Sequence, residues 1–177
     1  MTYLDDGLLA RLRSLEDASV APDLLGPDAP GERFVLEERV GAGGMGEVFR
    51  GRDLATGRVV AVKLLDAFNS EDYERFRREA SSLASLQHTA IVRYVAHGQL
   101  GARAFLAREG LEGENLDERL RHGGLTIGDT LAAGRRIAGA LAAAHERGIV
   151  HRDVKPTNVF LRDAEPSLAT LIDFGIA

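Results

Sequence analysis

Apolar and polar residues alternate along much of the first half of this chain, in a pattern typical of β-strands. From Phe34, the run FVLEERVGAGG alternates and then ends in glycines. Two more strand-like runs in GEVFRGRDLATGRVVAVKLL flank LATG, where Thr56 and Gly57 predict the turn of a hairpin. The segment AIVRYVAHGQLGARAFLARE predicts two further strands around GQLG. The first half is therefore predicted to be rich in β-strands.

The first 32 residues predict a helix followed by a linker. Leucines recur at helical spacing over residues 4 to 16, at Leu4, Leu8, Leu12 and Leu15. The stretch VAPDLLGPDAPGE, which holds three of the five prolines, predicts the linker. The helix either packs on the neighbouring domain or serves as a docking element, and packing is the more frequent role of such a helix.

Two longer segments predict helices within the main body. In SEDYERFRREASSLASLQH, Ser70 is the expected N-cap and an apolar stripe follows at helical spacing. In TIGDTLAAGRRIAGALAAAHER, Thr126 and Asp129 match a capping box, and Gly148 marks the end. The short apolar runs GIVHRD, NVFLRD and ATLIDFG follow. A strand-rich half with one helix, followed by a helical half, predicts two lobes.

Composition and charge narrow the classes of function. The 177 residues are 45% hydrophobic and 28% charged, which are ordinary values for a globular protein. The lack of cysteine excludes disulfides, thiolate metal sites and a cysteine nucleophile, and it fits the cytosol. A net charge of −5 argues against nucleic-acid binding, and no apolar run reaches the roughly 18 residues of a membrane span. We therefore predict a cytoplasmic chain without a membrane segment, although a longer parent protein could carry an anchor.

The segment VGAGGMGEV spaces Gly41, Gly43 and Gly46 as G-x-G-x-x-G. This pattern most often forms a dinucleotide-binding turn, which needs a helix directly after the glycines. Here a strand and a hairpin follow instead, which disfavours that interpretation. Glycines between strands can lay backbone N–H groups over phosphates, because no Cβ keeps the chain away. A hairpin tip that simply needs glycine is the alternative.

Lysine is rare in this chain, since only Lys63 and Lys155 stand beside 20 arginines. A compact ammonium suits a site that cannot accommodate the planar guanidinium, and chance in an arginine-rich chain is the alternative. Lys63 lies in the apolar run VVAVKLL, where burying an unpaired charge is costly, so it needs an anion. Glu79 on the next predicted helix offers a carboxylate, although alone it would be an ordinary solvated residue.

A dense polar group follows the apolar run GIV. In HRDVKPTN, Asp153 can accept a proton, Lys155 can neutralise a phosphate, and Asn158 offers a carbonyl oxygen suited to Mg²⁺. In LIDFG, Asp173 supplies a second hard oxygen ligand at the end of an apolar run.

In this order, the motifs resemble the signature of the protein kinases, and their sequences are similar to those of the bacterial eukaryote-like (Hanks-type) serine/threonine kinases. The resemblance covers residues 33 to 177. It implies an α+β, kinase-like fold with a complete β-rich N-lobe that carries one key helix, and the first part of a helical C-lobe. The implied divisions are the helix and linker over 1–32, the N-lobe over 33–110 and the partial C-lobe over 111–177.

The resemblance also implies roles for the glycines and the first lysine. Gly41, Gly43 and Gly46 would cover the phosphates of ATP. Lys63 would bind the α- and β-phosphates and would be held in place by Glu79. The pocket would then require an ammonium at Lys63, which accounts for lysine at that position.

The second half would supply the catalytic and metal-binding groups. By resemblance, Asp153 would orient the substrate hydroxyl and take its proton, and Lys155 would contact the γ-phosphate, as in serine/threonine kinases. Asn158 and Asp173 would hold Mg²⁺, or Mn²⁺ in its place. The side chains or backbone of six other residues would contact the adenosine: Val48, Ala61, Glu109, Leu111, Asn115 and Phe160.

Four residues match the stacked side chains that couple the lobes in active kinases: Leu83, Tyr94, His151 and Phe174. One residue departs from the family pattern. Arg108 stands directly before Glu109, where the family normally has an uncharged side chain at the back of the adenine pocket. Either the register assigned here is shifted by one residue, or the back of this pocket is unusual.

The chain stops at Ala177, two residues after Gly175, so the family's activation segment, Ala-Pro-Glu motif and later helices do not appear. We therefore expect an apolar face around Leu131, Ile137 and Leu141 to be partly exposed, which favours instability, aggregation or a partner. Arg152, which pairs with a phosphorylated activation loop in the family, has no such loop here.

The resemblance implies a serine/threonine protein kinase that transfers the γ-phosphoryl group of ATP to Ser/Thr hydroxyls of proteins. The first alternative is a truncated module that binds nucleotide or another kinase chain without catalysis. The second is an inert remnant, for which we would expect no cooperative folding. The expected partners are ATP, protein substrates and a further kinase chain, with no nucleic acid.

Overall fold

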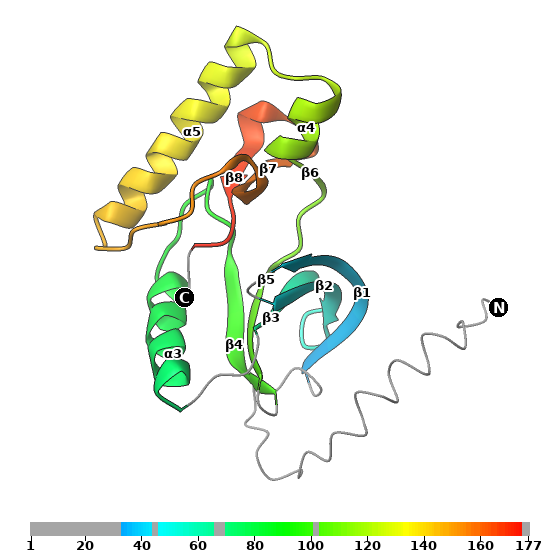
Figure 1. Cartoon of the computed structure of the whole chain (residues 1–177), viewed down its shortest axis with the longest axis vertical. Coiled ribbons are helices and arrows are strands. Elements are labelled where there is room, and N and C mark those ends of the chain that lie inside the picture. Colours follow the sequence, from blue (N-terminus) through cyan, green and yellow to red (C-terminus); the bar gives the residue numbers. More distant parts are fainter. Residues whose placement is uncertain (1–32, 44–45, 66–69, 101–102, 175–177) are drawn as a thin grey trace, which may run out of the picture.

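The computed structural model describes residues 33–43, 46–65, 70–100 and 103–174. The predicted helix over residues 4 to 16, its linker and Gly175 lie outside these ranges. Figure 1 shows two lobes. One contains a large sheet and helix α3 (Ser70–Ala84), and the other contains a small sheet with helices α4 (Leu116–His122) and α5 (Ile127–His145). No helix in the described part of the chain is long and apolar enough to cross a membrane.

The large sheet is antiparallel, with strand order β1-β2-β3-β5-β4. Its strands are β1 (Phe34–Gly43), β2 (Gly46–Asp53), β3 (Val59–Leu65), β4 (Tyr94–Leu100) and β5 (Arg103–Glu109). The predicted strands and the hairpin turn at Gly57 are confirmed. In β3, Val60, Val62 and Leu64 are buried in the lobe core, while Ala61 and Lys63 alternate onto the other face.

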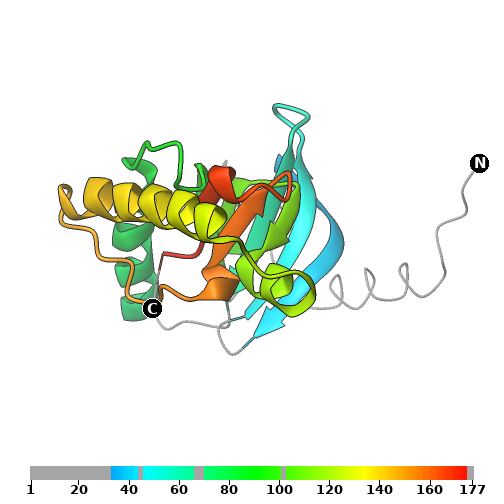
Figure 2. The same ribbon diagram turned by 90° about the horizontal axis from the view of Figure 1, so that it is seen from above.

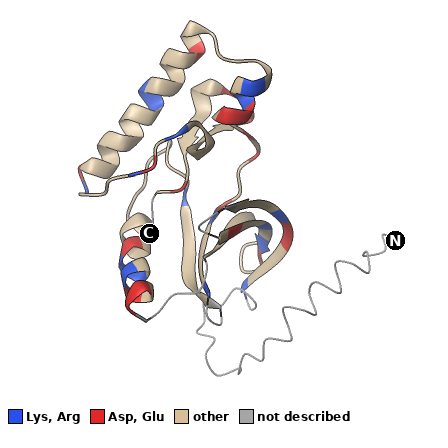
Figure 3. Cartoon of the chain, viewed as in Figure 1, with Lys and Arg blue, Asp and Glu red and all other residues tan. Residues whose placement is uncertain are grey.

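Helix α3 (Ser70–Ala84) stands beside β4 (Figure 1). Phe76 and Ala80 on its buried side pack with Leu65, Ala104 and Leu106 of the sheet. Acidic and basic residues share its remaining surface, as Figure 3 shows, whereas α5 is largely uncharged. The helix is confirmed, and it begins at the residue predicted as its N-cap and ends four residues before the end of the predicted segment.

The second lobe contains a small antiparallel sheet in the order β6-β7-β8. Its elements are β6 (Gly113–Asn115), α4 (Leu116–His122), α5 (Ile127–His145), β7 (Val159–Arg162) and β8 (Ala169–Leu171), with 3₁₀ turns at Pro156–Asn158 and Pro166–Leu168. The sequence analysis did not anticipate β6 or α4. Strand β6 is too short to show alternation, but the capping box of Asn115 and Glu118 was a usable signal for α4.

Helix α5 begins as predicted, with Thr126 as N-cap and a capping box to Asp129. It packs against β8 through buried alanines, which allow the close approach seen in Figure 2. The exposure expected for its apolar face is found at Leu131, which is 55% exposed. Ile137 and Leu141 instead pack partly against the core of this lobe, so the face is only partly open.

The segment after α3 fastens the two lobes together. The backbone N–H of Val92 donates to Leu171 O, and that of Leu171 donates to Ala90 O, both at 2.9 Å. From α5, Arg136 donates to the carbonyls of Thr89 at 2.7 Å and Ala169 at 2.8 Å. Leu86 and Ile91 consequently belong to the core of the second lobe. The division between residues 110 and 111 stays a prediction.

Two of the motif glycines have different structural demands. Gly46 has a φ of +120°, and a Cβ there would stand 1.9 Å from Leu64 O. At Gly41 the nearest neighbour of a Cβ would be Val48 Cβ, at an ordinary 3.9 Å. The fold therefore requires glycine at position 46, but not at position 41.

We expect Gly46→Ala to lower the free energy of unfolding by about 2–4 kcal/mol, because the new methyl would displace the backbone of β3. Gly41→Ala is the matched control and should change it by less than about 1 kcal/mol. Chemical denaturation of the three proteins measures both effects. A Gly46→Ala protein as stable as the wild type would contradict this backbone geometry.

Candidate active site

A cleft of about 420 Å³ lies between the lobes and is lined by both. Its walls include seven predicted site residues: Gly41, Val48, Ala61, Glu109, Leu111, Asn115 and Phe160. Val48 and Ala61 come from the large sheet and Phe160 comes from β7, so apolar groups face the cleft from both sides. The structure thus brings predicted site residues that are up to 119 positions apart, from Gly41 to Phe160, into the lining of one cavity.

The Glu109 side chain connects the lobes at the rim of this cleft. Its Oε1 accepts hydrogen bonds from the backbone N–H of Arg93 at 2.8 Å and from Arg162 Nη2 at 2.6 Å. Arg162, on β7, also donates to Thr170 Oγ1. Sequence reasoning missed Arg162, because no local pattern marks a partner 53 positions away.

The Asn115 side chain, which is predicted to contact the ribose, also caps helix α4. Its Oδ1 accepts a hydrogen bond from the N–H of Glu118 at 3.0 Å, which caps α4. Asn115 also lines the cleft, and with its Oδ1 engaged in the cap, its amide N–H group is the side-chain donor left for a ligand.

Asp153, Lys155 and Asn158, which stand close together in the sequence, form one hydrogen-bonded cluster. Asn158 Nδ2 donates to Asp153 Oδ2 at 3.0 Å and to Asp153 O at 2.8 Å. Lys155 Nζ lies 2.7 Å from the same Oδ2. The hydrogen bond from Lys155, with help from Asn158, holds the pKa of Asp153 below its usual range. Asp153 is therefore an ionised and oriented acceptor at neutral pH.

His151 links this loop to the end of the described chain. It is buried, its Nε2 lies 3.0 Å from Ile172 O, and its ring centroid is 4.5 Å from that of Phe174. Burial lowers the pKa of His151, although the contact with the Ile172 carbonyl opposes this. A neutral imidazole whose Nε2–H donates to that carbonyl satisfies both conditions.

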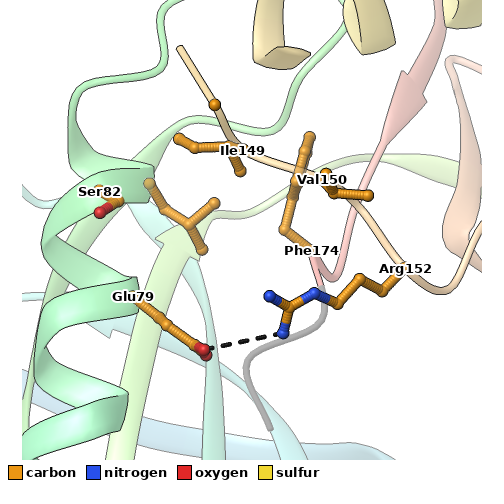
Figure 4. Close-up of a pocket in the computed structure, with 8 residues that line it drawn as sticks. Glu79, Ser82, Ile149, Val150, Arg152 and Phe174 are labelled. Carbon is orange, nitrogen blue, oxygen red and sulfur yellow. Dashed lines mark ion pairs between the residues drawn. The ribbon is translucent and has the colours of Figure 1, made fainter.

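This structure pairs Lys63 and Glu79 with other residues, so their predicted contact stays a prediction. Lys63 Nζ instead lies 3.6 Å from Asp173 Oδ2. Glu79 pairs with Arg152 Nη1 at 3.8 Å, as the dashed line in Figure 4 shows. The backbone of Asp173 has a φ of +54°, and its carboxylate meets a second cation from the N-lobe, Arg108. Two cations hold Asp173 at the sheet, so Lys63 is engaged there rather than at α3.

Glu79 is left only partly compensated by this arrangement. Its Oε2 is buried and has no hydrogen-bond partner among the residues that the structure describes. It borders a cavity of about 140 Å³ between α3 and the loop that leads to Asp153. Figure 4 shows Glu79 and Arg152 at one side of this cavity, with Ile149, Val150 and Phe174 across from α3. An acceptor of this kind is suited to a further cation.

Arg108 is the penultimate residue of β5, opposite Ala61 of β3 and Tyr94 of β4. This position favours an unusual pocket over a shifted register. The Arg108 side chain ion-pairs with Asp173 and lines both the main cleft and a small cavity of about 30 Å³ behind it. Leu83, Tyr94 and Phe174, three of the four residues expected to stack, surround that small cavity.

The electrostatics of Asp173 follow from its two partners. Burial disfavours its charged form, but the Arg108 and Lys63 cations outweigh this cost and lower the pKa of Asp173. Asp173 is therefore ionised at neutral pH, and both of its oxygens face a cation.

Asn158 and Asp173 are the donors that would hold a metal ion. The N–H of Ile172 donates to Asn158 O at 3.0 Å, which fixes the two segments side by side. No group of three or more His, Asp or Glu residues that could hold a metal occurs within the described ranges. One carboxylate and one amide oxygen suit Mg²⁺, which usually completes its shell with phosphate oxygens and water.

Comparison with known proteins gives consistent matches. A family model described as "Protein kinase domain" matches residues 34–177. Serine/threonine-protein kinase pkn2 of Myxococcus xanthus is 43% identical over 162 residues, which cover 89% of this chain and 19% of that protein. Serine/threonine-protein kinase PknL of Mycobacterium bovis is 38% identical over 148 residues, which cover 81% of this chain and 37% of that protein. The chain thus spans well under half of the length of these relatives.

Solved structures with the same fold include the PknI kinase domain of M. tuberculosis. It superposes with a TM-score of 0.72 at 32% identity, over 81% of this chain and 59% of that chain. Rad53 in complex with AMP-PNP has a TM-score of 0.74 at 28% identity, over 83% of this chain and 39% of that chain. The sequence match and the structural likeness therefore agree over the described lobes.

We expect Asp173→Asn to lower the free energy of unfolding at pH 7 by about 2 kcal/mol, because Arg108 and Lys63 would lose their shared anion. Since the folded pKa of Asp173 is depressed, its contribution is present above the ordinary pKa of about 3.9 and is lost as the pH falls below it. The difference from the wild type should therefore shrink below about pH 4.

Asp153→Asn is the control for this experiment, because the Asp153 side chain is 47% exposed and solvent can compensate the change. Its effect on stability should be smaller than that of Asp173→Asn. Denaturation curves recorded between neutral and acidic pH measure both variants. Equal losses, or a difference that does not depend on pH, would contradict the role given to the two cations.

Proposed function

Because the chain belongs to the protein kinase family, we propose that its cleft binds ATP with Mg²⁺ and that it transfers the γ-phosphoryl group to serine and threonine hydroxyls of proteins. The observation that carries this proposal is that the cleft leads directly to the polar residues Asn158 and Asp173. Thr157, Phe160 and Ile172 line the cleft. Asn158 and Asp173 are the next residues along the chain from Thr157 and Ile172. A nucleotide in the cleft would therefore direct its phosphates toward these oxygen ligands.

The base would occupy the apolar part of the cleft. Val48 and Ala61 from above and Phe160 from below would enclose the adenine ring. The backbone near Glu109 and Leu111 would meet its polar edge, and the ion pair of Glu109 with Arg162 keeps that segment in place. Gly41 would let the backbone of β1 approach the phosphates, because the fold itself has no need for glycine there.

The acceptor hydroxyl would be oriented by Asp153. Its depressed pKa makes it a weak base, which suits a reaction in which positioning and electrostatic stabilisation provide most of the rate enhancement. Lys155, already 2.7 Å from Asp153, would neutralise charge on the transferred phosphoryl group. Asn158 would hold Asp153 through its amide N–H group while its carbonyl oxygen stays free for a metal.

Bound Mg²⁺ would neutralise phosphate charge and hold the phosphates at Asn158 and Asp173. Lys63 would have to leave the Asp173 carboxylate for the α- and β-phosphates. The unpartnered Oε2 of Glu79 is the acceptor that would then receive Lys63, as the resemblance implies. In this proposal, the contact of Lys63 with Asp173 would belong to a resting state that nucleotide binding ends.

The test separates nucleotide binding from phosphoryl transfer. We expect Lys63→Met to weaken binding of a fluorescent ATP analogue with Mg²⁺ about tenfold or more, because one phosphate-directed cation is lost. Asp153→Asn should bind the analogue as the wild type does, yet transfer phosphate to a serine-containing protein substrate at least about a hundredfold more slowly.

Binding titrations and radiolabelled phosphate transfer measure these two effects. A wild-type chain that binds nucleotide but transfers none would favour the module that binds without catalysis. Loss of binding in Asp153→Asn as severe as in Lys63→Met would contradict the separate roles of the two residues.

A further inference from the structure

Arg108 is an unusual cation for its place in the fold. It lies on strand β5, between β3 and β4 at the back of the cleft, and its side chain is 10% exposed. A buried guanidinium needs an anion, because removing it from water without one is costly. The anion it has is Asp173, 65 residues further along the chain. The contact joins the back of the cleft to the residue expected to ligate the metal.

Both oxygens of Asp173 are engaged by cations. Arg108 Nη1 contacts Oδ1, and Lys63 Nζ lies 3.6 Å from Oδ2. A divalent ion that uses this carboxylate must replace at least one of these cations or share the carboxylate with it. We propose that Arg108 is an internal counter-ion that competes with the divalent metal for Asp173, and so sets the metal concentration that the site requires. This inference rests on the proposed function, because it assigns Asp173 to metal binding.

Arg108 is better placed than Lys63 to act in this way. Lys63 has a flexible stem, and nucleotide phosphates would offer it another anion. Arg108 has no second carboxylate partner among the described residues, and it lies too far back to be solvated freely. If Asp173 turns fully to a metal, the guanidinium is left buried without its anion. Metal binding therefore carries the cost of uncoupling Arg108, and a neutral side chain at this position removes that cost.

A purely structural role predicts something different. If Arg108 only fills the space beside the small cavity behind the cleft, replacing it changes stability and leaves the metal affinity of Asp173 unaltered. Competition instead predicts that metal affinity rises as the arginine charge is removed. The two accounts differ in the direction of a binding constant, which does not depend on activity.

The test uses the full 177-residue chain and Mn²⁺ alone as the probe, because Mn²⁺ has the same oxygen preference as Mg²⁺ and is measured directly by electron paramagnetic resonance. We expect Arg108→Met to tighten the Asp173-dependent Mn²⁺ binding about tenfold, which corresponds to about 1.4 kcal/mol. Adding Asp173→Asn to this variant should abolish the gain. Arg108→Lys, which keeps the charge, should stay closer to the wild type.

Arg50→Met is the matched control. Arg50 also lines the cleft, but its ion pairs are with Glu37 at 2.8 Å and Glu112 at 3.8 Å, and not with Asp173. It should leave Mn²⁺ binding unchanged. Thermal unfolding verifies that each variant is folded, and Arg108→Gln provides a second neutral variant if Arg108→Met is not.

The proposal would be overturned if the folded neutral variants bound Mn²⁺ at Asp173 no more tightly than the wild type does. It would also be overturned if these variants showed no Asp173-dependent Mn²⁺ binding. A parallel titration with the fluorescent ATP analogue keeps the two hypotheses apart. A wild type that binds no nucleotide defeats the proposed function, whereas the direction of the Mn²⁺ effect decides the role of Arg108.

Discussion

The Asp173 carboxylate, held between Lys63 and Arg108, is the interaction on which the arrangement of this site depends. The two cations come from adjacent strands of the large sheet, whereas Asp173 follows the last strand of the small one. The pair therefore joins the lobes across the back of the cleft. Because the interaction is partly buried, removing Asp173 would leave two cations without their shared anion.

Several other contacts depend on this position of Asp173. Phe174, directly after it, contacts His151, which in turn bonds to the carbonyl of Ile172. The placement of Lys63 at Asp173 also explains why Glu79 turns to Arg152 and retains an unpartnered oxygen. Glu109, which directly follows Arg108 on β5, forms with Arg162 a second link between the lobes that does not involve these residues. The cleft thus has one connection suited to exchange with a ligand and one that maintains its shape.

A sequence-based prediction agrees with the structure best where its signal lies within a few neighbouring residues. Strand alternation and the capping box of Thr126 and Asp129 reside within a few residues, so the large sheet and the start of α5 were predictable. The cleft residues were predictable only through the resemblance to kinases, which carries information on how distant segments meet. Strand β6 has three residues and no alternation, so no periodic signal marks it.

The structure pairs Lys63 with Asp173 and not with Glu79, the partner that the resemblance implies. The choice of anion depends on which cations surround each carboxylate, and this is a property of the tertiary structure. Arg108 was noticed as a departure, yet its attachment to Asp173 spans 65 residues and has no local signature. Charge pairs between lobes are set by the relative position of two sheets, which periodicity and spacing do not determine.

The most direct test of this account observes Lys63 itself. Lys63 and Lys155 are the two lysines of the chain, so ¹³C labelling of lysine gives one side-chain signal for each, and Lys63→Met assigns them. The account predicts that ATP with Mg²⁺ shifts the Lys63 signal, as the ammonium exchanges the Asp173 carboxylate for phosphate. A Lys63 signal that is unchanged while nucleotide binds would contradict the account, because the ligand would then lie elsewhere than at the lysine that this cleft is built around.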